Sequence, residues 1–193
     1  MSRALLRDRT GAALVEFAIV APVLLMLIFG SLEFGLNVYM RSVLEGAMQQ
    51  AGRNSSLQSA QAGQTAIDDA VAAQVRNILP RADVKFKRLN YQTLTGVSRP
   101  EDFTDTNGNN IRDPGECFTD INNNSMWDAD AGRTGQGGAN DVVKYTATVT
   151  YPSWIPVAAA MGISPTTSIS ATTILKNQPF ATQNGWTGTR ICT

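Results

Sequence analysis

The stretch Gly11-Ala12-Ala13-Leu14-Val15-Glu16-Phe17 decides the fold, because it joins a basic leader to an apolar stretch that runs almost unbroken to Leu32. From Ala12 to Tyr39 the helical pattern extends over 28 residues, which gives a helix of about 42 Å at 1.5 Å per residue. About 20 apolar residues suffice to cross a bilayer. We therefore expect one transmembrane helix that continues with amphipathic spacing as far as Arg53.

The leader indicates the orientation of this helix. It carries Arg3, Arg7 and Arg9 against a single Asp8, and an excess of basic residues holds the adjacent end of a helix in the cytoplasm. An ordinary secretory signal has a small-residue cleavage site after its apolar core, and none follows here. The sequence thus predicts a single-pass protein whose C-terminal part lies outside the cytoplasm.

Glu16 is an unusual residue at the beginning of a membrane helix. An ionised side chain inside a bilayer costs about 2.5–3.5 kcal/mol even on a lenient insertion scale. Such a carboxylate needs a partner. A second acid, Glu33, is expected near the far membrane face, where we predict a solvated interfacial position.

The N-terminal motif resembles that of a known family. A basic leader, Gly11, and then Glu16-Phe17 resemble a type IV prepilin cleavage site. More narrowly, the chain over about residues 9–53 is similar to the TadE-like pseudopilins of tight-adherence (Tad/Flp) pili. The matching elements are the stretch Thr10–Leu25, the pattern Gly30-x-x-Glu33-x-Gly35, and Ala51-Gly52-Arg53.

The resemblance implies how this segment works. It implies cleavage between Gly11 and Ala12 by a membrane prepilin peptidase, and it implies that Glu16 then pairs with a free N-terminal amine. A buried carboxylate is tolerable beside an ammonium group. It further implies that the helix packs among other minor pilins and the pilus assembly platform. A plain signal anchor with Glu16 in the headgroup region is the open alternative.

Composition excludes several classes of function. The chain has no histidine, which excludes Ser-His-Asp and Cys-His catalysis and His-ligated zinc, and we expect no enzyme. Without residues 1–11 the chain carries 13 basic and 15 acidic residues, so we expect no nucleic-acid partner. Cys117 and Cys192 are the two cysteines, and outside the cytoplasm a disulfide between them is the simplest arrangement.

The remainder of the chain predicts a small α+β head with a sheet packed on helices. A second amphipathic helix is expected from Thr65 to Leu79, with Thr65 as N-cap, Asp68 at the third helical position, and Pro80 after its end. Its apolar stripe is Ile67, Val71, Val75 and Ile78. Three antiparallel strands are expected from alternating apolar and β-branched residues, at 84–91, 142–151 and 168–175.

The expected domains are a leader (1–11), a transmembrane and pilin-like helix (12–53), and an extracytoplasmic head (54–193) with an Asp/Asn-rich loop at 101–140. The apolar segment Val157–Gly162 either packs on the sheet or touches the membrane, and the sequence does not separate these alternatives. Residues after Asn177 look irregular.

The Asp/Asn-rich loop contains a calcium-loop pattern. Positions 1, 3, 5, 9 and 12 of a 12-residue loop supply side-chain oxygens, and position 7 supplies a backbone carbonyl. The pattern D-x-[DN]-x-[DN]-G-x5-E fails only at position 6, where Asn110 tolerates the left-handed conformation that glycine usually takes. The predicted ligands are Asp105, Asn107, Asn109, Ile111, Asp113 and Glu116.

A second copy begins fifteen residues later. It has Asp120, Asn122, Asn124, Met126 and Asp128 at the corresponding positions. It lacks the acid at position 12, which is Ala131, although Asp130 is adjacent. We therefore expect one Ca²⁺ in the first copy and weaker binding in the second.

These loops resemble the EF-hand and dockerin type in loop sequence only, because their flanks do not predict helices. The calcium is expected to be structural, since it would order a long loop. A solvated Asn/Asp/Gly-rich turn region is the alternative. A carboxylate pair for hydrolysis is disfavoured because the chain offers no companion base.

Together these observations predict a minor pilin or pseudopilin in the inner membrane. Its head would lie in the periplasm, or outside the cell within a pilus. The rival prediction is a membrane-anchored periplasmic calcium-binding or adhesion protein that never enters a filament.

Overall fold

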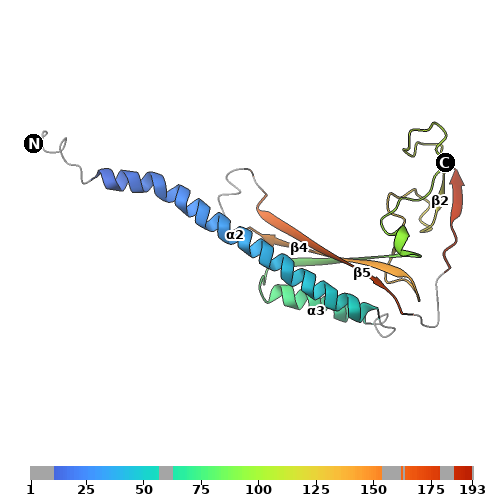
Figure 1. Ribbon diagram of the computed structural model, residues 1–193, viewed down its shortest axis with the longest axis horizontal. Helices are drawn as coiled ribbons and strands as arrows, with labels where there is room; N and C mark the ends of the chain where they lie inside the picture. Colours follow the sequence, from blue (N-terminus) through green and yellow to red (C-terminus); the bar gives the residue numbers. More distant parts are fainter. Residues whose placement is uncertain (1–10, 57–62, 154–161, 163, 179–184, 193) are drawn as a thin grey trace, which may run out of the picture. The chain divides into compact units, whose positions relative to one another are not determined.

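The computed structural model describes residues 11–56, 63–153, 162, 164–178 and 185–192 (Figure 1). The chain divides into two compact units, Met1–Met40 with Pro152–Thr167, and Arg41–Tyr151 with Ser168–Thr193. The predicted leader before Gly11 and most of the apolar segment 157–162 lie outside the described residues.

The first unit contains the beginning of a long helix. Helix α2, Ala12–Ser55, spans 44 residues and continues through Pro22. Within the first unit it exposes large apolar side chains, among them Leu14 (72 %), Phe17 (69 %) and Phe34 (71 %). Among the described residues, α2 is long and apolar enough to cross a membrane, so it is compatible with a single-pass anchor.

In the second unit, the C-terminal part of α2 packs through one face. Leu44, Ala47, Met48 and Ala51 are buried, at the three- and four-residue spacing that places side chains on one side of a helix. Gly52 brings this face close to the sheet. A Cβ atom at Gly52 would lie 3.0 Å from Thr173 Cγ2, on strand β5 (Thr166–Lys176).

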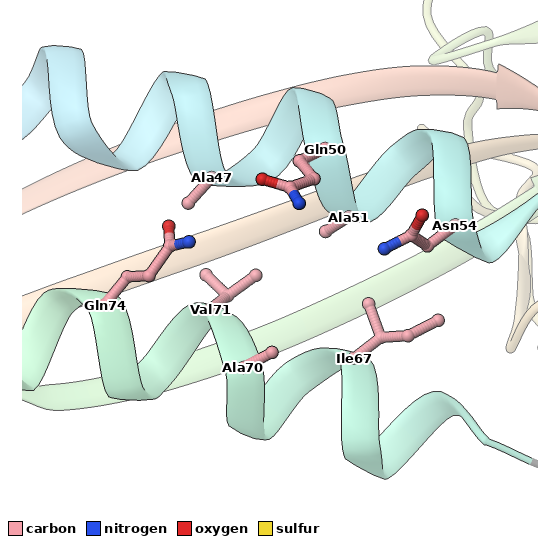
Figure 2. A pocket seen from close by; sticks show the side chains of 8 residues that line it. All are labelled: Ala47, Gln50, Ala51, Asn54, Ile67, Ala70, Val71 and Gln74. Atoms are coloured by element: carbon pink, nitrogen blue, oxygen red, sulfur yellow. The ribbon is translucent and has the colours of Figure 1, made fainter.

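Helix α3, Gln64–Arg76, lies beside α2 (Figures 1 and 2). Figure 2 shows Ile67 and Val71 of α3 facing Ala47 and Ala51 of α2 across a shallow groove. The buried residues of α3 are Val71, Ala72 and Val75, which confirms the centre of the predicted apolar stripe.

The predicted cap of this helix was wrong. The N-cap position is Gly63, and no side chain caps the helix. Asp68, which was assigned to the capped first turn, instead forms an ion pair with Arg88 of the sheet. A charge-assisted contact with a buried guanidinium is stronger than a neutral hydrogen bond, so tertiary pairing overrides the local helix-start signal.

The main sheet has the strand order β3-β1-β4-β5. It comprises β1 (Asp83–Tyr91), β3 (Arg133–Thr134), β4 (Val142–Pro152) and β5. The three predicted strands are confirmed, and the two-residue β3 is added at an edge. Strands β1 and β4 pair antiparallel, with Arg88 opposite Tyr145. Alternate residues of β4 are buried from Val143 to Tyr151, as expected for one covered face.

A buried polar cluster joins α3 to this sheet. Arg88 donates to both oxygens of Asp68, at 2.9 and 2.7 Å, and its guanidinium lies 3.9 Å from the centre of the Tyr145 ring. The Tyr145 hydroxyl also donates to Asp68. Burial, and then the hydrogen bond to Asp68, raise the pKa of Tyr145 above its ordinary value.

A second, two-stranded sheet was not predicted. Strand β2 (Cys117–Asp120) pairs antiparallel with β6 (Thr189–Cys192). The expectation of irregular structure after Asn177 is therefore wrong for 189–192. Both strands are only four residues long, and they pair across about 70 residues of sequence. Local periodicity therefore could not predict them.

Candidate functional site

The predicted processing segment lies where α2 begins. Gly11 forms a turn and Ala12 is the first helical residue. The N–H of Val15 donates to the Gly11 carbonyl at 3.2 Å, so the helical hydrogen bonds start at Gly11. Glu16 is exposed on this first turn, as is Phe17.

The two acids of the membrane helix differ in their surroundings. Among the described residues, none forms a hydrogen bond or an ion pair with the Glu16 carboxylate. Glu33, by contrast, accepts a hydrogen bond of 2.6 Å from the Ser153 hydroxyl and is half-buried. The structure thus gives Glu33 a partner that the sequence did not indicate, and its interfacial position stays a prediction. A residue 120 positions away supplies the donor, and no local pattern could have indicated it.

The Asp/Asn-rich insert contains two loops of the same backbone form. We call Asp105–Glu116 the first loop and Asp120–Ala131 the second loop. The fourth and sixth positions are left-handed in both. They are Gly108 (φ 76°) and Asn110 (φ 59°) in the first loop, and Asn123 (φ 63°) and Ser125 (φ 65°) in the second. The expected left-handed conformation of Asn110 is confirmed.

The aspartate at position 1 organises each loop in the same way. Asp105 accepts hydrogen bonds from the N–H groups of Gly108 (2.7 Å) and Asn110 (2.8 Å). Asp120 accepts from Asn123 (2.6 Å) and Ser125 (2.8 Å). The Asn110 N–H contributes most to lowering the pKa of Asp105 below its ordinary value.

Positions 3, 5 and 9 converge on one atom. In the first loop, Nδ2 of Asn107 (2.7 Å) and of Asn109 (2.8 Å) donate to Oδ2 of Asp113. In the second loop, the amides of Asn122 and Asn124 donate to Oδ2 of Asp128. Of the predicted ligand positions, 3, 5 and 9 are thus brought together in both copies.

At position 7, the side chains of Ile111 and Met126 are each 65 % exposed. Their N–H groups donate to Asn109 Oδ1 and Asn124 Oδ1. The side chains of position 7 thus point away from the loop's hydrogen bonds, and the carbonyl role expected of this position stays a prediction.

Glu116 closes the first loop. Its Oε1 accepts from the Thr106 N–H at 2.7 Å, and its Oε2 accepts from the Asp113 N–H at 3.0 Å. These bonds, the one from Asp113 first, lower the pKa of Glu116. Glu116 is also buried, so its carboxylate is held inside the loop.

Asp130, the acid beside position 12 of the second loop, is engaged elsewhere. It accepts hydrogen bonds from the Tyr91 hydroxyl (2.6 Å) and the Gly132 N–H (3.3 Å). It also pairs with Lys144 at 3.5 Å. Burial, and then the bond to Asp130, raise the pKa of Tyr91.

The donor groups of the first loop suit calcium, although they do not form a finished cage. Three carboxylates and two amides are hard oxygen ligands of the kind that Ca²⁺ takes. Among the described residues, no three Asp, Glu, His or Cys side chains converge as a metal site. The amides of positions 3 and 5 present nitrogen to Asp113, while their oxygens accept the backbone N–H groups of Asn109 and Ile111.

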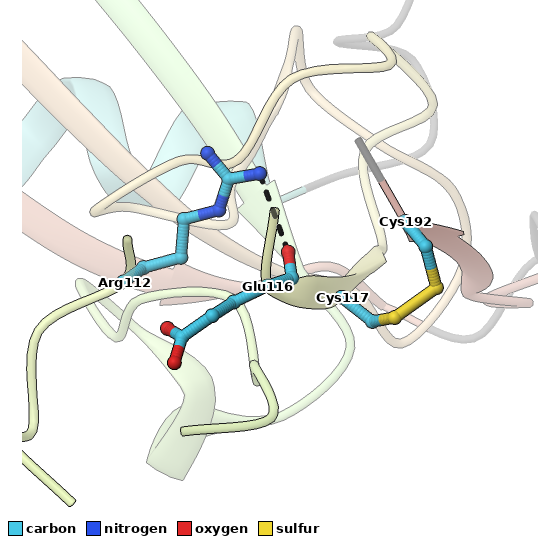
Figure 3. Close-up of a disulfide and its surroundings, with 4 residues drawn as sticks. All are labelled: Arg112, Glu116, Cys117 and Cys192. Carbon is cyan, nitrogen blue, oxygen red and sulfur yellow. Dashed lines mark hydrogen bonds between the residues drawn. A yellow bond between two sulfur atoms is a disulfide. The ribbon is translucent and has the colours of Figure 1, made fainter. Parts of the chain in front are cut away.

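The disulfide lies directly after the first loop (Figure 3). Cys117 follows Glu116, and it bonds to Cys192 in a directly opposed pair of β2 and β6. This confirms the predicted bridge. Arg112 Nη2 donates to the Glu116 carbonyl at 3.3 Å, which also fixes the end of the loop beside the bridge.

Sequence reasoning missed one acid of this region. Glu101 is fully buried at 0 % exposure, and its carboxylate accepts the N–H groups of Ile121 and Asp128 in the second loop. It lies outside both repeats, so their spacing could not identify it.

Comparison with known proteins bears on the N-terminal segment. A family model described as TadE-like protein matches residues 11–53, which confirms the resemblance seen in the sequence and indicates a Tad pilus-associated protein. No curated protein matches the chain, and no solved structure matches it.

Proposed function

We propose that this protein is a minor pilin, or pseudopilin, that takes part in the assembly of a Tad-type pilus at its base or tip. A prepilin peptidase cleaves its precursor between Gly11 and Ala12. The N-terminal part of α2 first anchors the chain in the inner membrane and then packs among other pilin helices. The head lies in the periplasm, or outside the cell when the protein is in a filament, and calcium stabilises it.

The observation that carries the proposal is the exposed apolar surface of the helix in the matched segment. Most of its large apolar side chains from Leu14 to Tyr39 are exposed, from 44 % at Ile28 to 72 % at Leu14. At about 25 cal/mol per Å² of apolar surface, water is an unfavourable surrounding for such a helix. Lipid and the helices of other pilins both supply a suitable one.

Glu16 favours the proposed pilin function over the alternative of a plain membrane anchor. It is a carboxylate one turn into an apolar helix, and the described residues give it no partner. Cleavage after Gly11 creates an ammonium group at Ala12, four residues before Glu16. That amine, on the same or a neighbouring subunit, offsets the cost of burying the carboxylate.

Calcium is proposed for the first loop on the basis of its ligand pattern, its left-handed sixth position and its buried Glu116. In this role the ion holds the insert in one conformation and performs no chemistry. The rival function, a membrane-anchored calcium-binding or adhesion protein outside any filament, shares the loops and differs in the N-terminus.

Mass spectrometry of the chain from membranes separates the two functions. We expect a mature N-terminus at Ala12, and Gly11→Leu should retain the leader. Glu16→Gln should be cleaved normally yet fail to support pilus assembly. Glu45→Gln is the matched control, because Glu45 is an exposed acid of the same helix that pairs with Arg41. An intact leader in the wild type, or full piliation with Glu16→Gln, contradicts the proposal.

A further inference from the structure

The feature that carries a further inference is the buried carboxylate of Glu101. Its Oε1 accepts the N–H of Ile121 at 2.7 Å, and its Oε2 accepts the N–H of Asp128 at 3.2 Å. These donors are positions 2 and 9 of the second loop. Glu101 itself precedes the first loop by four residues.

Glu116 makes the corresponding pair of contacts in the first loop. Its Oε1 accepts the N–H of Thr106, at position 2, and its Oε2 accepts the N–H of Asp113, at position 9. The two glutamates thus bridge the same two backbone positions. One reaches its loop from position 12, and the other from a distant part of the chain.

We infer that Glu101 gives the second loop the carboxylate that Glu116 gives the first, so that the head holds two equivalent calcium sites. This inference rests on the calcium binding proposed above. It removes the reason to expect a weaker second site, which was the absence of an acid at Ala131.

Backbone contacts explain how Glu101 reaches the second loop. Its own N–H donates to the Asp128 carbonyl at 2.9 Å, and its carbonyl accepts the indole N–H of Trp127 at 2.9 Å. The next residue, Asp102, accepts the Thr119 N–H from β2 at 2.8 Å. The segment therefore runs between β2 and the end of the second loop, with little freedom to withdraw.

With Glu101 included, the two loops have the same ligand chemistry. Each has three carboxylates and two asparagine amides. The first set is Asp105, Asp113, Glu116, Asn107 and Asn109, and the second is Asp120, Asp128, Glu101, Asn122 and Asn124. Equal charge and equal ligand number favour similar affinities for calcium.

The electrostatics of the second loop also favour a cation. Glu101 (0 %) and Asp120 (2 %) are buried, and within the described part of the chain no Lys or Arg forms an ion pair with either. Buried carboxylates that face only neutral N–H groups are costly. A divalent cation at positions 1, 3, 5 and 9 would compensate this charge.

The second loop contains its own reporter, because Trp127 occupies its position 8. Terbium(III) binds calcium sites and emits when a nearby indole transfers excitation to it. We would titrate the full-length chain in detergent with calcium by calorimetry, and separately with terbium under tryptophan excitation. Trp127→Phe identifies the emission that comes from the second loop.

The wild type should bind two calcium ions per chain. Glu101→Gln should weaken one of them by roughly 10- to 100-fold and remove the Trp127-dependent emission. Glu116→Gln should weaken the other and leave that emission intact. Asp102→Asn is the matched control, because Asp102 is the adjacent acid and is exposed.

The outcomes separate this inference from the proposal beneath it. No calcium binding by the wild type refutes the proposed calcium site and the inference together. Binding of calcium that Glu101→Gln leaves unchanged refutes only the role of Glu101. Loss of both ions in Glu101→Gln also overturns the assignment, because Glu101 would then support the whole insert rather than one loop.

Discussion

The buried ion pair between α3 and the sheet makes a quantitative prediction. Asp68→Asn keeps the size of the side chain and removes its charge. It leaves the guanidinium of Arg88, which is 7 % exposed, without its carboxylate. Nε of Arg88 already has no hydrogen-bond partner among the described residues. No neighbouring group therefore replaces the lost carboxylate.

The expected loss of stability in Asp68→Asn follows from the burial of the ion pair and from the contacts that Arg88 keeps. Removing one partner of a buried pair costs about 3–5 kcal/mol. Asp68 keeps 21 % exposure, and the Tyr145 ring still faces the guanidinium. We therefore expect the lower end, about 3 kcal/mol, which corresponds to an approximately 150-fold change in an equilibrium constant.

Hydrogen exchange measured by mass spectrometry on the full chain in detergent is the suitable assay, since it reports local opening of β4. Asp69→Asn is the matched control, because the neighbouring acid is exposed and should change stability by no more than about 0.5 kcal/mol. The double variant Asp68→Asn with Arg88→Met should recover much of the loss, since it removes both charges. Equal exchange rates in Asp68→Asn and Asp69→Asn would refute the reasoning.

Two further predictions concern the loop insert. Replacing Cys117 and Cys192 by serine should lower the stability of the insert by at most about 4.5 kcal/mol, because the bridge closes a separation of 75 residues; unchanged exchange protection of β2 would contradict this. In a calcium-free buffer, acid should loosen the first loop, because the folded state lowers the pKa of Asp105 and Glu116. Their stabilisation is present above their ordinary values near 4 and is lost as the pH falls through the lowered ones. The protection factors of the amides in 105–116, which correct exchange rates for their intrinsic pH dependence, should therefore be constant from neutral pH to about pH 5 and fall below about pH 4. A fall in protection that begins near neutrality would count against this reasoning.

The sequence was sufficient for the elements with strong periodicity. The apolar stretch after Phe17 predicted α2, and the Val/Thr alternation at 142–151 predicted β4, because in each case the same side-chain period is maintained over many residues. The aspartate-asparagine spacing likewise predicted two loops whose backbones proved alike.

The failures share one physical cause, which is pairing between distant segments. Asp68 was assigned to a helix cap and instead pairs with Arg88, twenty residues away. Strand β6 has four residues and is defined by its partner β2. Glu33 finds its donor at Ser153. In each case the deciding contact is absent from the local pattern.

The place of β2 connects the disulfide to the calcium proposal. Glu116, the last position of the first loop, immediately precedes β2, and Asp120, the first position of the second loop, is its last residue. Pairing with β6 and the bridge at Cys117 therefore fix the spacing between the two loops. The segment that carries Glu101 runs along the same strand, through the Thr119 N–H and the Asp102 carbonyl. Reduction of the bridge would release β6 and leave β2 held from one side only, so calcium affinity in both loops should decrease together on reduction. If the calcium affinity is unchanged after reduction, the loops are positioned by their own hydrogen bonds, and pairing with β6 does not fix their spacing.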